Sequence, residues 1–215
     1  MRTGAWAAAW VVLALALVFA APAGAGTWSV EHVDGGGYHF DHLWTSLALD
    51  SLGQPIIAYG TDGLGIARWN GTTWSLGDVM AEECIAEAPS VAVDGTGNPA
   101  VSYSDASGIG GLKYARWTGS AWAIETVDGA AAVGKFSSLR LDDAGDPAIS
   151  YYDEGNHDLK YARWTGAAWA LETVDSAGDV GSYTSLALDP AGNPAIGYYD
   201  ATNGDLKYAR WTGTA

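Results

Sequence analysis

Short runs of alternating apolar and polar residues recur along most of this chain. One stretch holds four of them, which are Ser138–Asp142 (SLRLD), Ala148–Tyr152 (AISYY), Leu159–Trp164 (LKYARW) and Trp169–Val174 (WALETV). A period of two residues is typical of strands, and the runs are rich in the β-branched and aromatic residues that strands favour. No segment outside the N-terminus shows the period of a helix. The pattern predicts an all-β chain.

Turn sequences separate these runs. Asp142–Pro147 (DDAGDP) combines Gly145, which can adopt the positive φ that closes a turn, with Pro147, which is tolerated at the first position of a strand. Asp153–Asp158 (DEGNHD) reads as a polar loop, and Thr165–Ala168 (TGAA) as a second tight turn. The stretch therefore predicts four short antiparallel strands.

The same unit occurs four times, with repeats that begin at Ser46, Ser90, Ser138 and Ser185, which are 44, 48 and 47 residues apart. Four short strands in a repeat of this length are the signature of a β-propeller blade, and blades must stack because each exposes two apolar faces. We predict a β-propeller of about four four-stranded antiparallel blades in residues 26–215.

The closure of the last blade is also predicted. Trp28–Val33 lies within a segment, TWSVEHVD, that matches the fourth strands Trp122–Asp128 and Trp169–Asp175, and the repeat that begins at Ser185 stops before its own fourth strand. We expect Trp28–Val33 to complete that blade. The alternative is that the sequence is a piece of a longer protein with five to seven blades.

The repeat resembles those of secreted bacterial and archaeal β-propeller proteins related to the sialidase-type and lectin-type propellers. The resemblance is carried by Ser185–Asp200 (SLALDPAGNPAIGYYD) and Leu206–Gly213 (LKYARWTG) and covers nearly all of residues 26–215. The turns depart from the sialidase Asp-box, S-x-D-x-G-x-x-W, because a proline interrupts that motif. The resemblance implies the fold and no single activity.

The N-terminus predicts export. Arg2 precedes an apolar run from Ala5 to Ala21, and small residues follow it, as in a secretory signal peptide. We place the signal at residues 1–25, with cleavage after Ala23 or an uncleaved anchor as alternatives. The chain is then secreted, extracellular or periplasmic, with no membrane insertion after signal removal.

Charge and cysteine content narrow the function. The formal net charge is −15, which argues against nucleic acid and against anionic membrane surfaces as partners. One cysteine, Cys84, rules out an internal disulfide.

Two faces of the predicted propeller differ. The first face carries the loops between second and third strands and the connections between blades, whereas the second face carries the uniform tight turns. Because the first-face loops vary from repeat to repeat, we expect a binding site there. The candidates for ligand binding are Trp44, Asp105, Asp153, Asp158, Asp200 and Asp205.

Two groups of residues have the chemistry of metal ligands. Asp200, Asn203 and Asp205 place oxygen ligands around a glycine and predict a calcium site, although the spacing is not that of an EF-hand. The alternative is that they form the turn. The second group, with no known ligand spacing, is His39, Asp41, His42 and Cys84, for which a solvated loop is the alternative.

Arginine and tryptophan recur at fixed places in the repeat. Arg68, Arg116, Arg163 and Arg210 are equivalent, so we interpret them as packing between blades and stacking on tryptophan. The recurrent tryptophans are interpreted in the same way, with sugar-stacking platforms as the alternative.

The sequence thus predicts a secreted, non-enzymatic β-propeller that binds an extracellular glycan or protein, with calcium as the one cofactor considered. The alternatives are a sialidase-like glycoside hydrolase or lyase, and a piece of a larger cell-surface propeller protein.

Overall fold

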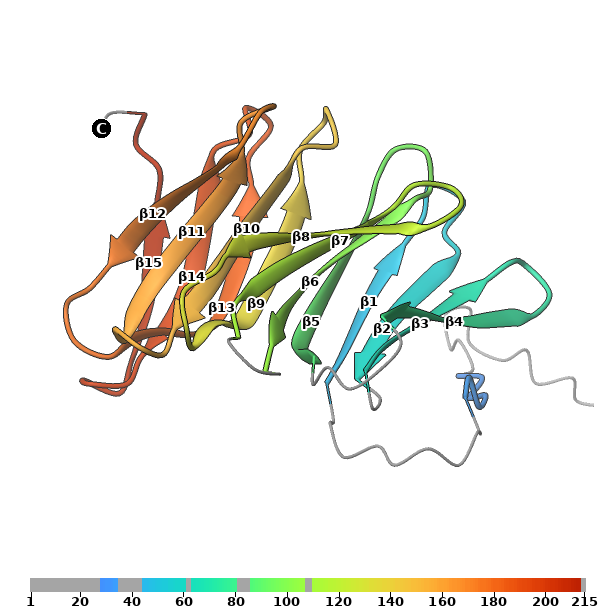
Figure 1. Cartoon of the computed structure of the whole chain (residues 1–215), viewed down its shortest axis with the longest axis horizontal. Helices are drawn as coiled ribbons and strands as arrows, with labels where there is room; N and C mark the ends of the chain where they lie inside the picture. Colours follow the sequence, from blue (N-terminus) through green and yellow to red (C-terminus); the bar gives the residue numbers. More distant parts are fainter. Residues whose placement is uncertain (1–27, 35–43, 61–62, 81–85, 107–109, 214–215) are drawn as a thin grey trace, which may run out of the picture. The chain divides into compact units, whose positions relative to one another are not determined.

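The computed structural model describes residues 28–34, 44–60, 63–80, 86–106 and 110–213. In these residues fifteen strands form four antiparallel sheets that follow one another in chain order, and there is no helix (Figure 1). The predictions of an all-β fold and of four-stranded antiparallel sheets are confirmed.

Each sheet corresponds to one sequence repeat. Sheet 1 contains β1 (Thr45–Leu49), β2 (Pro55–Gly60), β3 (Leu64–Trp69) and β4 (Trp74–Met80). Sheet 2 contains β5 (Ala86–Val93), β6 (Pro99–Asp105), β7 (Leu112–Trp117) and β8 (Trp122–Asp128). Sheet 3 contains β9 (Val133–Leu141), β10 (Pro147–Asp153), β11 (Asp158–Trp164) and β12 (Trp169–Asp175). Sheet 4 contains β13 (Val180–Leu188), β14 (Pro194–Asp200) and β15 (Asp205–Arg210).

The turn between the first two strands of a sheet is closed by its aspartate. In sheet 3 the Asp142 carboxylate accepts hydrogen bonds from the backbone N–H groups of Ala144 and Asp146, both at 2.9 Å, and Gly145 has a φ of +84°. Asp50, Asp94 and Asp189 cap the equivalent turns. This geometry explains the aspartate and the glycine of the repeat.

The first strands begin earlier than the alternation predicts. β9 begins at Val133 rather than at Ser138, and its pairing with β10 is irregular between Ser150 and Tyr152. Phe136, at a φ of +53°, lies within this irregularity. Such a bulge breaks the two-residue period, so the first half of the strand was predicted as a connection.

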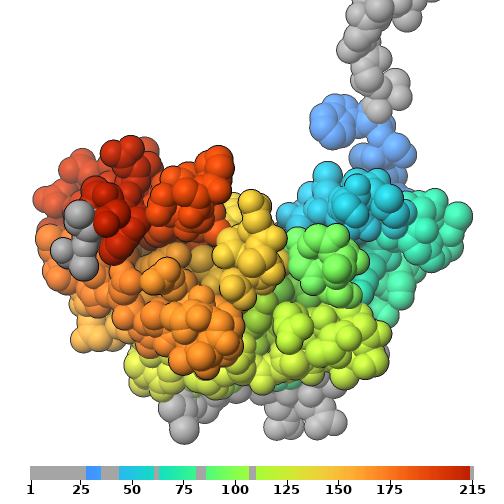
Figure 2. Space-filling model, turned by 90° about the horizontal axis from the view of Figure 1, so that it is seen from above, coloured from blue at the N-terminus to red at the C-terminus, as the bar shows by residue number. Residues whose placement is uncertain are grey.

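Apolar clusters fill the junctions between successive sheets. Junction 1 lies between sheets 1 and 2, junction 2 between sheets 2 and 3, and junction 3 between sheets 3 and 4. Each junction has its own apolar cluster. Tyr103 is fully buried in the cluster of junction 1, Ile149 in that of junction 2 and Leu186 in that of junction 3. The space-filling view shows the sheets following one another in the same order (Figure 2).

The serine that opens each repeat links its sheet to the next. The Oγ atoms of Ser46, Ser90 and Ser138 each accept a hydrogen bond at 3.0 Å from a backbone N–H of the following first strand. The donors are Val91, Leu139 and Leu186. The recurrent serine is therefore a connector between sheets.

Replacing Ser138 by alanine should lower the free energy of unfolding by about 1–2 kcal/mol, because the buried N–H of Leu186 would lose its acceptor. Ser185→Ala is the matched control: Ser185 is exposed and makes no such bond within the described residues. Urea unfolding of both variants measures the difference. Equal stabilities of the two variants would contradict the connector role.

The predicted closure by Trp28–Val33 is wrong for this structure. Residues 28–34 contain no strand, and the described part of sheet 4 has three strands. An alternating pattern gives a segment the composition of a strand, but a strand also needs a partner for its backbone groups. The predicted signal peptide, residues 1–25, lies outside the described residues. Among those residues, no helix is long and apolar enough to cross a membrane.

Candidate binding pockets between the sheets

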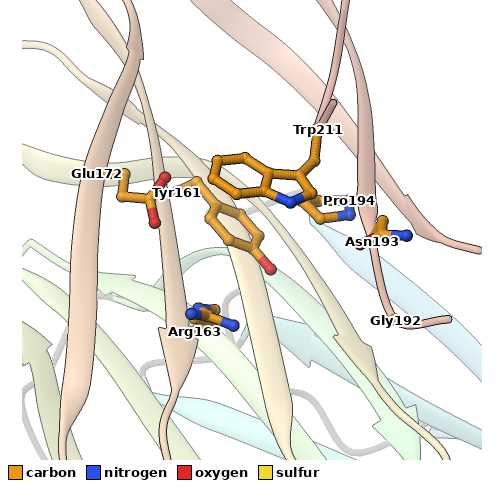
Figure 3. A pocket seen from close by; sticks show the side chains of 7 residues that line it. All are labelled: Tyr161, Arg163, Glu172, Gly192, Asn193, Pro194 and Trp211. Atoms are coloured by element: carbon orange, nitrogen blue, oxygen red, sulfur yellow. The ribbon is translucent and has the colours of Figure 1, made fainter. Parts of the chain in front are cut away.

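A pocket opens at junction 3. Tyr161 and Arg163 of β11 and Glu172 of β12 form one side, and Pro194 and Trp211 form the other (Figure 3). It measures about 200 Å³, and an adjoining hollow of about 220 Å³ shares Tyr161, Glu172, Pro194 and Trp211. Both are smaller than the ~300–1,000 Å³ of pockets for drug-sized ligands, which suits a single small ring.

Strand geometry explains why these side chains meet. Tyr161 and Arg163 are two residues apart, so they project from the same face of sheet 3. Glu172 lies directly opposite Tyr161 in the antiparallel register of β11 and β12. The turn that contains Asn193 belongs to sheet 4 and lies at the second face. The pocket is thus built by the uniform part of the repeat.

The charged groups of this pocket lack partners. Neither the guanidinium of Arg163 nor the carboxylate of Glu172 forms a hydrogen bond or ion pair within the described residues. Lys160, on the same strand, instead donates to Asp128 at 2.6 Å. Burial raises the pKa of Tyr161 to about 12, so its hydroxyl stays protonated at neutral pH. The pocket therefore offers a cationic donor, an anionic acceptor, a phenol and an indole.

Junction 2 repeats the arrangement. Tyr114, Arg116, Glu125 and Trp164 occupy the equivalent positions and line a wider hollow of about 590 Å³. Arg116 and Glu125 also lack partners in the described part of the chain. The Tyr114 hydroxyl is buried and has no hydrogen-bond partner there, while Trp169 packs against its ring at 5.5 Å. A buried hydroxyl without a partner is costly and can be satisfied by a ligand.

The arginine of junction 1 has different neighbours. Ile66 and Gly77 replace the tyrosine and glutamate, and Arg68 lies 4.9 Å from the ring of Trp117 and 5.7 Å from that of Trp122. Burial lowers the pKa of Arg68. This arginine is held by cation–π contacts with two tryptophans.

The interpretation of the recurrent arginines is therefore confirmed at one junction only. Arg68 stacks on tryptophan, whereas Arg116 and Arg163 line pockets. The sequence held a signal that our reasoning missed. Glutamate accompanies tyrosine and arginine in the second and third repeats, and both the glutamate and the tyrosine are absent where Arg68 stacks.

Two predicted ligand-binding aspartates serve the fold. Asp153 and Asp200 are each 2% exposed, and their carboxylates accept hydrogen bonds from the backbone and side-chain amides of Asn156 and Asn203. The Nζ atoms of Lys160 and Lys207 lie 3.8 and 3.7 Å from them. The hydrogen bonds of Asn203, together with Lys207, lower the pKa of Asp200.

The other predicted residues are placed separately. Asp105 lies 4.0 Å from Lys113. Asp158 and Asp205 pair with Asp153 and Asp200 at the hairpin ends, Asp158 half-buried and Asp205 exposed. The Trp44 ring is 39% exposed and meets Phe136 edge-on at 6.1 Å. Ligand binding by any of these residues stays a prediction.

The calcium prediction gains nothing from the geometry. The Asp200 carboxylate faces Asn203 and Lys207, which is the turn-forming alternative. In the described residues no three histidine, cysteine or acidic side chains gather as metal ligands would. His39, Asp41, His42 and Cys84 lie outside the described residues.

A second recurrent cluster joins neighbouring sheets near the first face. At junction 2, Asp128 of sheet 2 accepts hydrogen bonds from Tyr151 Oη at 2.8 Å and Lys160 Nζ at 2.6 Å, both from sheet 3. At junction 3, Asp175 meets Tyr198 and Lys207 in the same way. Burial alone would raise the pKa of Asp128, but the hydrogen bonds from Lys160, Ala130 and Tyr151 outweigh it and lower the pKa. We name these clusters the Asp128 lock and the Asp175 lock.

Comparisons with known proteins establish the fold. No family model and no curated protein matches the sequence. Among solved structures, a variant of AofleA from Arthrobotrys oligospora with three arginines replaced by alanine has a TM-score of 0.60 at 17% identity, covering 82% of this chain and 57% of that chain. The lectin of Aleuria aurantia, described as a six-bladed β-propeller with a fucose recognition mode, has a TM-score of 0.55 at 14% identity, covering 80% and 59%. The Hadza microbial sialidase Hz136 has a TM-score of 0.59 at 14% identity, covering 80% and 44%.

The chain is thus a β-propeller protein with four sheets, and its fold is similar to that of sialidase and lectin propellers. It spans 44–59% of the length of these three relatives. The predicted resemblance to sialidase-type and lectin-type propellers is confirmed at the level of the fold.

Proposed function

We propose that this chain is a secreted carbohydrate-binding β-propeller protein that holds its ligands, without chemical conversion, in the pockets of junctions 2 and 3. The observation that carries the proposal is the recurrence of an unpartnered arginine–glutamate pair beside a tyrosine and a tryptophan. The pairs are Arg116 with Glu125 and Arg163 with Glu172, and each faces a hollow.

These groups match the chemistry of a sugar. A pyranose ring presents an apolar C–H face, which can pack on the indole of Trp164 or Trp211, and hydroxyl groups around its edge. The guanidinium donates to those hydroxyls and the carboxylate accepts from them, as charge-assisted hydrogen bonds. Lectins with fucose recognition lie among the fold relatives, so fucosides are the first probes to choose.

An enzymatic role has less support. A glycosidase needs a carboxylic acid kept protonated by a raised pKa beside a second carboxylate. The aspartates with shifted pKa values in the described residues shift downward, through turns and the two locks: Asp94, Asp128, Asp175, Asp189 and Asp200. The partners we propose are therefore glycans bound without turnover.

The test is calorimetric titration of the protein with methyl α-fucoside and a panel of other methyl glycosides. We expect saturable binding of one glycoside at each of junctions 2 and 3. Arg163→Ala should abolish one site and Arg116→Ala the other, because each removes the charged donor of its pocket.

Arg140→Ala is the control, since Arg140 is exposed and donates only to the backbone carbonyl of Leu139. Its titration should equal that of the wild type. Binding that survives the double replacement of Arg116 and Arg163, or no binding to any glycoside, would overturn the proposal.

A further inference from the structure

One polar cluster of the first face occurs in a single copy. Tyr152 Oη donates to Asp179 Oδ1 at 2.8 Å and lies 2.8 Å from His157 Nδ1. His157 belongs to the loop between β10 and β11, and Asp179 to the connection before β13. Because the phenol has one proton and gives it to Asp179, His157 must donate through Nδ1. In the neutral imidazole, the Nε2 lone pair then remains able to accept a hydrogen bond.

Asp179 differs from four less exposed acids near this face. Asp128, Asp153, Asp175 and Asp200 each lie within ion-pair distance of a lysine. Asp179 has no lysine or arginine partner within the described residues, its one contact of this kind being with His157 at 3.8 Å. Its side chain is 40% exposed. It is a fixed negative charge that the fold does not neutralise with a lysine.

Aromatic rings continue from this cluster. Phe136 lies 6.3 Å from Tyr152 and 4.3 Å from Tyr183, and Tyr183 lies 6.5 Å from Tyr199. Tyr183 is 67% exposed and Tyr199 39%. The neighbouring Lys135 is ion-paired with Glu154 at 2.8 Å. We name the set of Phe136, Tyr152, His157, Asp179, Tyr183 and Tyr199 the aromatic–Asp179 surface.

We propose that the aromatic–Asp179 surface binds an organic ammonium group. Exposed aromatic faces attract cations through their ring quadrupoles, and methylated ammonium groups are the ligands that aromatic clusters recognise best. Asp179 supplies the charge complement, and His157 Nε2 supplies a second acceptor. The net charge of −15 adds long-range attraction for a cation. The surface lies at the face opposite the sugar pockets, so this inference is independent of the proposed function.

Choline is the probe, and its uncharged isostere 3,3-dimethylbutan-1-ol is the matched ligand. Titration of the intact protein, followed by the NMR signal of the N-methyl protons, should show saturable binding of choline. The isostere should bind at least about fivefold more weakly, because it keeps the shape and loses the charge.

Two variants locate the site. Tyr183→Ala should weaken choline binding by about three- to fivefold, the effect of one exposed cation–π contact, and Asp179→Asn by about tenfold. Tyr208→Ala is the control, because it removes an exposed tyrosine elsewhere on sheet 4. Equal binding of choline and the isostere would overturn the proposal. Unchanged choline binding in both Tyr183→Ala and Asp179→Asn would also overturn it. If methyl glycosides displaced choline and Asp179→Asn had no effect, the surface would be a sugar-binding surface and the proposal would fail.

Discussion

Replacing Gly181 by alanine is expected to lower the free energy of unfolding by about 3 kcal/mol or more. Gly181 has a φ of +107°, which a residue with a Cβ rarely adopts. Its backbone lies against sheet 3, and an added Cβ would stand 2.7 Å from the Cα and 2.9 Å from the N of Leu159. Those are backbone atoms of β11, so no side-chain rotation can relieve the clash. Sheets 3 and 4 would have to separate.

Two other glycines separate the cost of backbone strain from the cost of the steric clash. Gly192 has a φ of +79° with nothing within 4 Å of an added Cβ, so Gly192→Ala should cost about 1 kcal/mol from backbone strain alone. Gly197 has neither a positive φ nor a near neighbour, so Gly197→Ala should be neutral or slightly stabilising. Guanidinium unfolding of the three variants ranks them. If Gly181→Ala were no less stable than Gly192→Ala, the close packing of β13 against β11 would not be what holds sheets 3 and 4 together.

Much of the fold could be predicted because each repeat contains the sequence signals for its own strands and turns. Alternation marks the strands, and the turn of Asp142–Pro147 contains an aspartate that caps it and a glycine that reverses it. The first half of β9 was missed because the bulge at Phe136 breaks the alternation. The strand predicted at Trp28–Val33 does not form although its pattern is that of a fourth strand, because residues 28–34 make no strand pairing and β15 remains the edge of the described part of sheet 4.

The candidate site was harder to predict, because a residue that recurs in each repeat can either support the fold or line a repeated pocket. We interpreted every recurrent arginine as structural, yet the same residue type packs at Arg68 and lines hollows at Arg116 and Arg163. What separates them is the cross-strand pair beside the arginine. Ile66 lies opposite Gly77 next to Arg68, whereas Tyr114 lies opposite Glu125 and Tyr161 opposite Glu172 next to the other two arginines. Conversely, Asp153 and Asp200 end strands β10 and β14 beside the variable loops but accept hydrogen bonds from Asn156 and Asn203. Loop variation therefore did not indicate which acids are accessible.

Replacing Asp128 by alanine should destabilise the protein by about 3 kcal/mol. The carboxylate is buried between sheets, and its removal leaves the Lys160 ammonium and the Tyr151 hydroxyl without their acceptor. Tyr151 is fully buried, so water cannot readily replace that partner. Burial and the hydrogen bond to Asp128 raise the pKa of Tyr151, which keeps the phenol a donor.

The chain offers a milder replacement of its own. At junction 1 the position equivalent to Asp128 is Met80, whose sulfur accepts a hydrogen bond from Tyr103 Oη at 3.7 Å. The equivalent lysine, Lys113, donates to Thr126. Asp128→Met together with Lys160→Met would therefore remove both charges of the Asp128 lock and keep the volume filled, while Asp153, 3.8 Å from Lys160, keeps its two hydrogen bonds from Asn156. Replacing a buried ion pair by apolar residues is often close to neutral, so this double variant should be more stable than Asp128→Ala.

The pH dependence of unfolding separates charge from packing. Because the pKa of Asp128 is lower in the folded state, its contribution is fully present above the unfolded pKa of about 3.9 and is lost as pH falls through the lower folded value. Wild type should therefore lose more stability than Asp128→Asn as pH falls from 5 through the lowered folded-state pKa of this carboxylate. Carboxylates that do not contact Lys160 have the same surroundings in both proteins, so their contributions cancel in the comparison. Parallel stability curves down to pH 2 would mean that the Asp128 lock acts by shape alone, and that junction 2 owes its strength to the apolar cluster around Ile149.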